Sequence, residues 1–390
     1  MFLRSLKLER LLSFGPDTAA MELRPLNVLI GPNGSGKSNF IEAIALLKAA
    51  PKDLDRALRE GGGSTNWVWK GKPLAGIEVT SDIELRPSVH HYYDQFRDLR
   101  HELRFLNAQE YDAFIISERI DVTGPTPDVP FPRVCFDDHM GAHLYDNGNP
   151  REFQHRNLGQ SILSQVKGPD YPEIDALGDF YDSIRIYREF TFGRRSPARR
   201  AQPADLPTDH LMESTENLGL ILNKFRRDVP SKKALIQELE NVFEGITDFG
   251  VDVQSSSAQI FLEEKHWTIP ATRLSDGTIR WLALLAILLD PKPPPLVCIE
   301  EPELGLHPDL MNPLARILKS ASERMQIIIT THSEALVDAF RESPEDVIVC
   351  ERPAGSTIMR RLDRQQLAEW LEEYSLGQLW SRGIIGGSRW

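Results

Sequence analysis

The sequence predicts an α/β protein with a mixed or parallel core sheet, an antiparallel β lobe and an inserted region of helices and strands. A short apolar strand at 26–30 leads into a glycine-rich turn, and apolar residues recur at helical spacing from about Lys37. Later apolar strands at 296–300 and 326–330 are separated by helical sequence. Because this alternation is typical of a parallel sheet, both ends of the chain are expected to build the core.

We expect the 390 residues to divide into four segments. Residues 1–85 form the N-terminal part of the core and include an alternating strand at 74–85. Residues 86–265 form the insertion. Residues 266–345 form the C-terminal part of the core, and 346–390 form a C-terminal extension of strand and helix.

The inserted region carries its own secondary-structure signals. The segment 94–106 is predicted to be helical, and Asn147-Gly148 is a dipeptide favoured in β-hairpin turns. The other expected elements are strands at 111–122, 251–254 and 258–264 and helices at 217–228 and 232–243.

The composition indicates a globular protein without a disulfide framework. Charged residues make up 26% and apolar residues 41%, which is ordinary for a globular chain. The scattered Cys135, Cys298 and Cys350 fit a reducing compartment. The most apolar run, 281–289, is too short to cross a bilayer. We therefore expect a soluble, cytoplasmic protein, and a net charge of −12 excludes nucleic-acid binding by overall attraction.

Residues 31–38, GPNGSGKS, fit the phosphate-binding pattern G-x-x-x-x-G-K-[ST] in full and lie between an apolar strand and a helix. The glycines let the backbone turn its N–H groups inward, and the helix N-terminus favours phosphate oxygens. Lys37 is expected to reach the β- and γ-phosphates of a nucleotide, and the Ser38 hydroxyl to ligate Mg²⁺. The candidate nucleotide-binding residues are Gly31, Pro32, Asn33, Gly34, Ser35, Gly36, Lys37, Ser38 and Asn39.

The apolar strand at 296–300 ends in carboxylates. A strand end in the ligand crevice of an α/β sheet places Glu300 as a candidate Mg²⁺ ligand, acting through a water. Glu301 is the candidate general base that orients the attacking water. Glu303 follows a proline and is interpreted as a structural or supporting residue. The alternative is an acidic loop after a buried strand.

A histidine follows the next apolar strand, at 326–330. A polar residue at this position points into the ligand crevice, so His332 is a candidate catalytic residue that contacts the γ-phosphate or the attacking water. Thr330 and Thr331 are candidate sensors of the γ-phosphate. The alternative is a solvated histidine in a helix-capping loop.

With these residues in place, the chain resembles the head of an ABC-type ATPase, and more narrowly the branch that holds SMC, RecF and OLD-family proteins. The strings that carry the resemblance are GPNGSGKSN at 31–39, LSDGT at 274–278, IEEPELGLHP at 299–308 and TTHS at 330–333, in the family's order. The resemblance implies an enzyme that hydrolyses ATP with Mg²⁺. The chain lacks the long coiled coil of SMC proteins and has no room for the TOPRIM nuclease domain of OLD proteins.

In ABC heads, the signature loop caps the nucleotide held by a second head that packs head-to-tail. By this resemblance Ser275, Asp276 and Gly277 are expected to act in trans, with Ser275 and Gly277 contacting the γ-phosphate held by a partner's Lys37. The chain is then expected to form a homodimer around ATP. The alternative is that LSDG serves only as a helix N-cap.

The family's contexts are DNA repair and bacterial defence against phage. Because the ATPase core has no effector attached, we expect a regulatory or sensor ATPase of anti-phage defence that works with a separate effector, such as a nuclease or a toxin. The alternative is a RecF-like repair ATPase that binds DNA directly. Its candidate nucleic-acid surface runs from Arg185 to Arg200, where arginines interleave with Tyr187, Phe190 and Phe192. A solvated face is the other interpretation of this stretch, and a transporter subunit and a non-catalytic scaffold are further alternatives.

Overall fold

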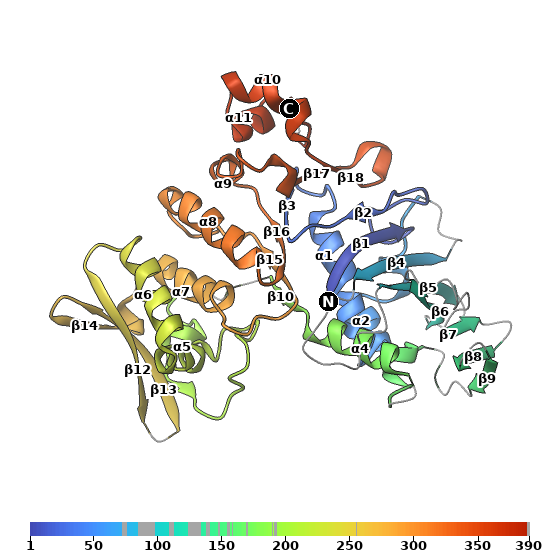
Figure 1. The fold of residues 1–390 in the computed structure, drawn as a ribbon, viewed down its shortest axis with the longest axis horizontal. Helices are drawn as coiled ribbons and strands as arrows, with labels where there is room; N and C mark the ends of the chain where they lie inside the picture. Colours follow the sequence, from blue (N-terminus) through green and yellow to red (C-terminus); the bar gives the residue numbers. More distant parts are fainter. Residues whose placement is uncertain are drawn as a thin grey trace. The chain divides into compact units, whose positions relative to one another are not determined.

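The chain forms two compact units, each assembled from segments that are distant in the sequence (Figure 1). Unit 1 comprises Met1–Ile184, Glu345–Leu367 and Arg382–Trp390, and unit 2 comprises Arg185–Pro344 and Ala368–Ser381. These boundaries differ from those of the four predicted segments, which stay a prediction. The structure is a computed structural model that describes residues 1–71, 76–84, 98–108, 113–123, 134–137, 141–146, 149–153, 157, 159–168, 171–188, 190, 193–254 and 256–387.

Unit 1 contains an eight-stranded antiparallel sheet in the order β2-β1-β4-β5-β6-β7-β8-β9, which confirms the predicted antiparallel lobe. The strands β8 and β9 pair antiparallel, with Asp146 opposite Asn149. The predicted turn residues between them, Asn147 and Gly148, lie outside the described residues. The strands are β1 (Phe2–Glu9), β2 (Met21–Glu22), β4 (Ile77–Glu84), β5 (Asp98–Ala108), β6 (Ala113–Thr123), β7 (Val134–Asp137), β8 (Gly141–Asp146) and β9 (Asn149–Phe153).

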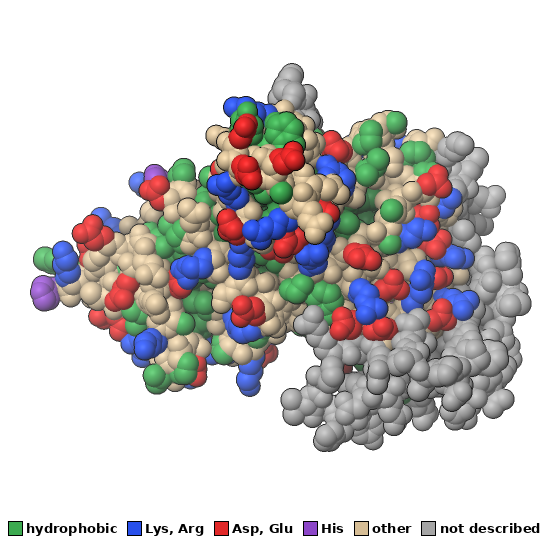
Figure 2. Space-filling model, turned by 45° about the horizontal axis from the view of Figure 1, so that its top comes forward, with side chains coloured by type: hydrophobic (Ala, Val, Ile, Leu, Met, Phe, Trp, Pro, Cys, Tyr) green, Lys and Arg blue, Asp and Glu red, His purple; other side chains and the backbone are tan. Residues whose placement is uncertain are grey.

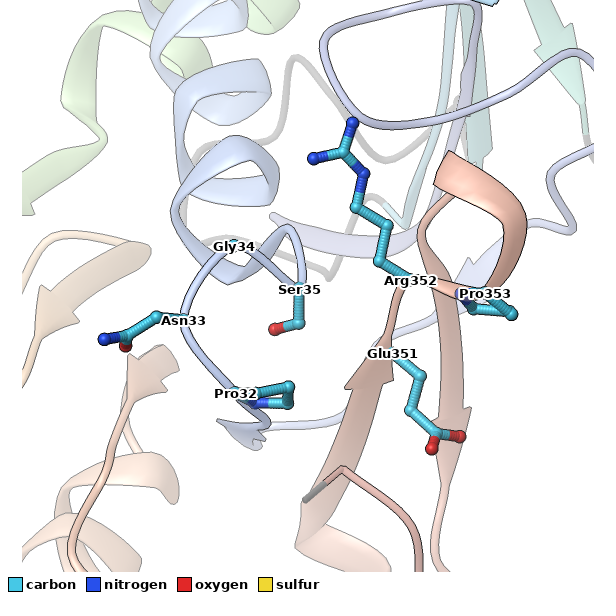
Figure 3. A pocket seen from close by; sticks show the side chains of 7 residues that line it. All are labelled: Pro32, Asn33, Gly34, Ser35, Glu351, Arg352 and Pro353. Carbon is cyan, nitrogen blue, oxygen red and sulfur yellow. The ribbon is translucent and has the colours of Figure 1, made fainter. Parts of the chain in front are cut away.

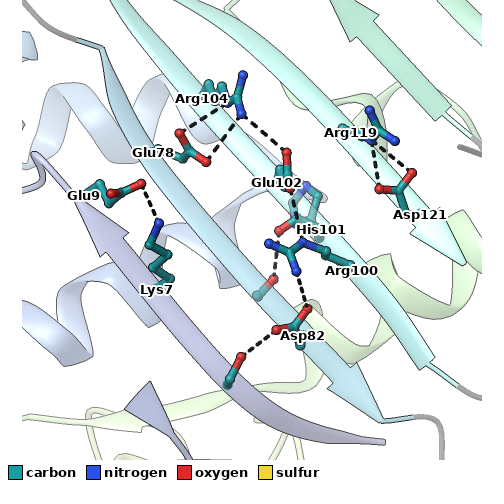
Figure 4. Close-up of polar contacts among 12 residues, drawn as sticks. Lys7, Glu9, Glu78, Asp82, Arg100, His101, Glu102, Arg104, Arg119 and Asp121 are labelled. Carbon is teal, nitrogen blue, oxygen red and sulfur yellow. Dashed lines mark hydrogen bonds and ion pairs between the residues drawn. The ribbon is translucent and has the colours of Figure 1, made fainter. Parts of the chain in front are cut away.

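The central strands of this sheet bury one face and leave charged residues on the other. In β5, Leu99 and Leu103 are fully buried, whereas Arg100 and Arg104 alternate with them and reach solvent. Exposed ion pairs contribute at most about 1 kcal/mol each, so the buried face is what holds the sheet. The polar face, shown in Figure 4, includes the pairs Lys7–Glu9 at 3.0 Å, Arg104–Glu78 at 3.4 Å and Arg119–Asp121 at 2.8 Å.

The predicted helix over 94–106 is wrong, because the described part of this segment belongs to β5. Leu99 and Leu103 are four residues apart, a spacing that a helix and a strand both allow. The residue that decides between them is His101, which is fully buried, so that positions 99, 101, 103 and 105 form one buried stripe of period 2. When His101 is treated as a polar residue, the alternating pattern of a strand cannot be recognised in the sequence.

A polar cluster lies within the buried face of the sheet. The Tyr181 hydroxyl lies 2.7 Å from Ser81 Oγ and 2.9 Å from His101 Nδ1, and His101 Nε2 lies 2.7 Å from Glu118 Oε1. Glu118 also accepts a hydrogen bond from Ser161 Oγ at 2.7 Å. Burial raises the pKa of Tyr181, which therefore stays protonated and able to donate. Because each member is paired, the cluster fixes the helix that carries Tyr181 to three strands.

A second, smaller sheet in unit 1 carries the glycine-rich turn. Strand β3 (Leu26–Ile30) pairs in parallel with β17 (Val347–Glu351), which pairs antiparallel with β18 (Ile358–Arg361). Helix α1 (Lys37–Ala49) follows the turn, so the predicted strand at 26–30 and the helix from Lys37 are confirmed. The remaining helices of unit 1 are α2 (Leu54–Glu60), α3 (Ser64–Trp67) and α4 (Pro172–Ser183).

Unit 2 has a parallel sheet of β10 (Arg185–Tyr187), β15 (Leu296–Glu300) and β16 (Gln326–Thr330), in that order. The two predicted apolar strands at 296–300 and 326–330 are therefore confirmed, together with the helices between them. Helix α7 (Asp276–Leu288) is buried from Thr278 onward, which explains its apolar sequence. The other helices of this part are α8 (Met311–Ser322) and α9 (Glu334–Asp338).

An antiparallel sheet completes unit 2, with β13 (Ser257–Glu264) between β11 (Gln202–Pro203) and β12 (Ile246–Gln254) and with β14 (Trp267–Pro270) pairing β13. Helices α5 (Leu218–Arg227) and α6 (Val229–Glu240) confirm the two predicted helices. Helix α10 (Arg364–Glu373) begins in unit 1, and α11 (Leu376–Ser381) belongs to unit 2. Within the described residues, no helix combines the length and apolar character that crossing a membrane requires.

Candidate nucleotide site and signature loop

The phosphate loop connects β3 to α1 and depends on its glycines. Gly31, Gly34 and Gly36 have φ angles of +148°, +78° and +105°, which L side chains rarely adopt. A Cβ at Gly36 would lie 2.3 Å from Thr357 Oγ1, and a Cβ at Gly31 would lie 2.2 Å from the carbonyl oxygen of Cys350. A Cβ at Gly34 would meet nothing within 4 Å. Conformation and space together therefore require glycine at 31 and 36.

Two buried residues that are distant in the sequence brace this loop. Thr357 Oγ1 donates to the carbonyl oxygen of Ser35 at 2.9 Å and lies 2.7 Å from Ser13 Oγ, whose hydroxyl can donate to it. Asn39 Nδ2 also donates to Ser13 Oγ, at 2.8 Å. Sequence reasoning missed Ser13 and Thr357, since neither lies in a recognisable motif.

Lys37 is the first residue of α1, and its side chain folds back onto the loop. The residue is 5% exposed, and its Nζ donates to the carbonyl oxygens of Gly31 at 2.7 Å and Pro32 at 3.1 Å. Ser38 follows at the exposed start of the helix. This places an ammonium, a hydroxyl and a helix N-terminus at one loop, a combination that suits an anionic ligand.

A hollow of about 500 Å³ lies beside the loop. Figure 3 shows the side chains that line it, with the loop on one side and the end of β17 and the residues after it on the other. Ser35 Oγ is buried at this side of the loop and hydrogen-bonds to no described residue. Glu351 and Arg352 belong to the C-terminal extension and were not among the predicted site residues. The lining residues are Pro32, Asn33, Gly34, Ser35, Glu351, Arg352 and Pro353.

The signature loop in unit 2 forms the N-terminus of α7. Ser275 is exposed, and its Oγ accepts a hydrogen bond from the Thr278 N–H at 3.0 Å, which confirms that this serine caps the helix. The two hydroxyls of Ser275 and Thr278 lie 2.8 Å apart. Thr278 can donate to Ser275 in that contact, which leaves the serine proton for another acceptor. The cap and a contact in trans are therefore chemically compatible.

Arg199 holds the signature loop from behind. It is 8% exposed and donates to the carbonyl oxygens of Ala271 and Leu274 and to Asp276 Oδ1. The Gly193 N–H donates to the same carboxylate oxygen at 3.0 Å. The hydrogen bond with Arg199 lowers the pKa of Asp276, which keeps this carboxylate ionised. Asp276 is thus turned toward its own chain, whereas Ser275 faces solvent.

The arginine-rich stretch differs from the expected nucleic-acid surface. Tyr187 and Phe190 are 2% and 7% exposed and stack on each other with ring centroids 6.2 Å apart, so neither ring is open to a base. Phe192 lies outside the described residues. Positive and negative side chains are interspersed on the face shown in Figure 2. The exposed arginines of the stretch are Arg188, Arg194, Arg195 and Arg200, and a nucleic-acid contact through them stays a prediction.

The carboxylates after β15 point in different directions. Glu300 Oε1 lies 3.6 Å from Arg188 Nε on the end of the neighbouring strand β10. Glu301 is a non-glycine residue with a φ of +46°, and its N–H donates to the carbonyl oxygen of Thr330 at 3.0 Å. Its Oε1 lies 3.8 Å from His332 Nε2, and both side chains are partly exposed. The structure therefore brings together the predicted base and the predicted histidine.

Glu303 has the supporting position that the sequence suggested. Its Oε1 accepts hydrogen bonds from Thr331 Oγ1 at 2.6 Å and from the His332 N–H at 3.0 Å. Burial raises the pKa of Glu303 despite these donors. The side chain ties the turn after β15 to the turn after β16, and so fixes the backbone of His332 relative to Glu301.

Arg280, in the second turn of α7, is a buried residue that sequence reasoning missed. It is 2% exposed, and its Nε donates to the Pro302 carbonyl oxygen at 3.1 Å while Nη2 donates to that of Glu301. Burial lowers the pKa of Arg280 to about 10, so the guanidinium remains charged at neutral pH. The available signal is a charged residue within an otherwise apolar helix.

The fold and these motifs define a P-loop nucleotide-hydrolysing head of the ABC/SMC-like class. The chain belongs to the family described as "AAA domain, putative AbiEii toxin, Type IV TA system", which matches residues 26–338. The chromosome partition protein Smc of Gloeobacter violaceus is 52% identical over 59 residues, which are 15% of this chain and 5% of that protein. The present chain therefore matches only a small part of that relative's length.

Solved structures of SMC heads share the fold. An SMC head bound to the C-terminal winged-helix domain of ScpA superposes with a TM-score of 0.58 at 14% identity, over 94% of this chain and 99% of that one. The SMC head domain of Thermotoga maritima gives 0.51 at 14% identity, over 93% and 100%. A Pyrococcus furiosus SMC head bound to the C-terminal domain of ScpA gives 0.54 at 14% identity, over 95% and 99%. At this identity the likeness shows the fold alone.

Proposed function

We propose that this chain hydrolyses ATP and acts as a switch that dimerises head-to-tail around ATP. The observation that carries the proposal is the phosphate loop, in which glycine conformations, the buried Lys37 ammonium and the start of α1 converge on one concave segment. A loop of this kind binds the β- and γ-phosphates of a nucleotide through backbone N–H groups and the lysine. Membership of a nucleotide-hydrolysing family supports the same reaction.

The chemistry of two predicted residues suits Mg²⁺ as a ligand of the proposed site. Ser38 offers a hydroxyl and Glu300 a carboxylate, and oxygen ligands are those that Mg²⁺ prefers. When bound, Mg²⁺ would neutralise part of the phosphate charge. Arg188, 3.6 Å from Glu300, competes for this carboxylate and favours a contact through water. The remaining nucleotide-binding residues, Gly31 to Asn39, act through their backbone and short side chains.

Glu301 and His332 carry the proposed chemistry. Glu301 is the general base that orients the attacking water, and His332, 3.8 Å from it, contacts the γ-phosphate or the same water. The partial exposure of both side chains supports this role, because a ligand can reach them. In the proposed dimer, Ser275 contacts the γ-phosphate on a partner chain, supported by its exposed position at the start of α7.

Asp276 and Gly277 take different roles from Ser275 in this proposal. Asp276 is engaged by Arg199 within its own chain, so it shapes the signature loop. A Cβ at Gly277 would lie 3.0 Å from the carbonyl oxygen of Gly305, so the glycine permits close packing of its own chain. Each chain then supplies half of two active sites, and ATP holds the halves together.

We infer further that the switch serves anti-phage defence as a regulatory or sensor ATPase with a separate effector. The description of the family, with its putative toxin and Type IV TA system, supports this context. Phage challenge of cells that express the chain together with its neighbouring genes tests this inference. Protection should be lost on Glu301→Gln and on deletion of the effector. DNA degradation by the isolated chain that persists in Glu301→Gln would contradict the inference.

The reaction is tested by phosphate release from ATP. We expect Mg²⁺-dependent hydrolysis by the wild type, loss of both nucleotide binding and hydrolysis in Lys37→Ala, and loss of hydrolysis alone in Glu301→Gln. Removal of a catalytic group commonly lowers the rate by about a hundredfold or more. A Lys37→Ala variant that retains both activities would overturn the proposal.

A further inference from the structure

The signature helix is joined to the loop that carries Glu301 within the same chain. Arg280 of α7 donates through Nε to the Pro302 carbonyl oxygen at 3.1 Å and through Nη2 to the Glu301 carbonyl oxygen. Its guanidinium carbon lies 4.7 Å from the centre of the Phe190 ring, which packs over the cation. An arginine fork that is 2% exposed and shared by two consecutive carbonyls leaves this loop little freedom relative to the helix.

The first turn of α7 meets the same loop at a second point. A Cβ at Gly277 would approach the carbonyl oxygen of Gly305 to 3.0 Å, so the backbones are close there. Gly277 lies two residues after the exposed Ser275, and Arg280 lies on the following turn. A displacement of the signature end of α7 therefore reaches the loop through two contacts, one of backbone and one of side chain.

Glu301 is the residue most sensitive to such a displacement. Its φ of +46° is unfavourable for a residue with a Cβ and persists only where the surroundings determine it. Its N–H is held by the Thr330 carbonyl oxygen at 3.0 Å, and its own carbonyl oxygen is held by Arg280. The Glu301 N–H also lies 3.2 Å from Thr330 Oγ1, and its carbonyl oxygen also accepts from the Leu304 N–H at 3.1 Å. The direction of the carboxylate thus depends on hydrogen bonds at both peptide groups of Glu301, and the Arg280 bond is the one that comes from the signature helix.

We propose that Arg280 is a positioning residue that couples the signature of this chain to its own Glu301. The inference rests on the proposed function. When Ser275 contacts the ATP held by a partner, α7 takes up one fixed position. Arg280 then holds Glu301 in the position from which it acts on the chain's own ATP. ATP bound at one site therefore positions the catalytic glutamate of the other site. The rate of hydrolysis rises cooperatively with ATP concentration, with a Hill coefficient above 1.

The test replaces Arg280 by lysine, which keeps the charge but cannot donate to two carbonyls as a fork. We expect Arg280→Lys to lower kcat by about tenfold or more and to bring the Hill coefficient to about 1. Binding of a fluorescent ATP analogue to the isolated chain should change by less than about twofold, because Lys37 and its loop belong to unit 1. Arg280→Ala should lower kcat further.

Arg324→Lys is the matched control. Arg324 also donates to two backbone carbonyls of this region, those of Asp290 at 2.6 Å and Leu288 at 2.7 Å, but at the opposite end of α7. We expect its kcat and Hill coefficient to equal those of the wild type. A general loosening of α7 would instead affect both variants.

The outcomes separate this inference from the function on which it rests. An inactive wild type contradicts the proposed function itself. An active wild type with a Hill coefficient of 1 contradicts both the dimerising switch and the coupling. An Arg280→Lys variant with unchanged kcat and cooperativity overturns the coupling alone. The coupling is also overturned if Arg280→Lys lowers thermal stability and nucleotide binding together with kcat, since Arg280 would then only stabilise the fold.

Discussion

In the proposed function the phosphate loop and the signature loop both bind phosphate, but the structure holds the two loops in place differently. The phosphate loop takes its shape from its own glycines, with φ angles that only glycine adopts easily, and from a short brace at Ser13 and Thr357. The signature loop contains ordinary backbone and is held by the buried Arg199, 77 residues before Asp276. The first loop thus depends mainly on glycines within it, with added support from Ser13 and Thr357, whereas the second depends on a distant side chain.

The largest effect is expected from a change in the phosphate loop that both the backbone conformation and neighbouring side chains oppose. In Gly36→Ala the new Cβ would lie 2.3 Å from Thr357 Oγ1 at a φ of +105°, so the loop must distort. We expect nucleotide binding to be lost, measured by titration with a fluorescent ATP analogue, because this strain costs about 1–3 kcal/mol before the clash is counted. Gly355→Asn is the control, since a Cβ there meets nothing within 4 Å, asparagine tolerates its φ of +83°, and the residue lies outside the phosphate loop.

The corresponding change in the signature loop removes its distant support. Arg199→Ala removes the guanidinium that donates to two carbonyl oxygens and to the Asp276 carboxylate, which keeps the Gly193 N–H as a donor. We expect kcat for ATP hydrolysis to fall by about tenfold or more, because hydrogen bonds to charged groups contribute about 1.5–3 kcal/mol. Nucleotide affinity of the isolated chain should not change. The exposed Arg195→Ala serves as the control, and equal effects of the two variants would show that the burial of Arg199 is irrelevant.

The same difference explains what the sequence could predict. The strand at 26–30, the loop, α1 and the carboxylates after β15 follow from patterns within about ten residues, and all are present. Arg199 and Arg280 could not be assigned, because their partners are backbone carbonyls that carry no sequence signal. The error at β5 has a related cause, since His101 reads as polar unless its buried partner Tyr181 is known.

A smaller effect is expected from the buried tyrosines of the two units. Tyr181→Phe removes the hydroxyl shared by Ser81 and His101, whereas Tyr187→Phe removes one hydrogen bond, to the Leu211 carbonyl oxygen at 2.8 Å. We expect Tyr181→Phe to lower the free energy of unfolding by about 1–3 kcal/mol and Tyr187→Phe by about 1 kcal/mol. Denaturant unfolding measures both. A larger loss in Tyr187→Phe would contradict the importance assigned to the cluster around His101.

The smallest effect concerns pH and the Arg199–Asp276 pair. The hydrogen bond with Arg199 lowers the pKa of Asp276 below its ordinary value of 3.8. A lowered folded-state pKa contributes stability above 3.8 that is lost as pH falls through the folded-state value. The wild type should therefore exceed Asp276→Asn in denaturant midpoint at pH 7, and the difference should shrink with acidification below pH 4. A difference in denaturant midpoint that grows on acidification would show that the folded-state pKa of Asp276 is raised and not lowered.

The most direct test of the central claim, that each chain supplies half of two sites, is the solution mass of Glu301→Gln with and without Mg-ATP. The variant should bind ATP without hydrolysing it and shift from monomer to dimer. The double variant Glu301→Gln/Ser275→Arg should bind ATP equally well and remain a monomer, because Ser275 is exposed and acts only on the partner's nucleotide. A Glu301→Gln chain that stays monomeric with ATP bound would contradict the claim and leave the signature as a helix cap.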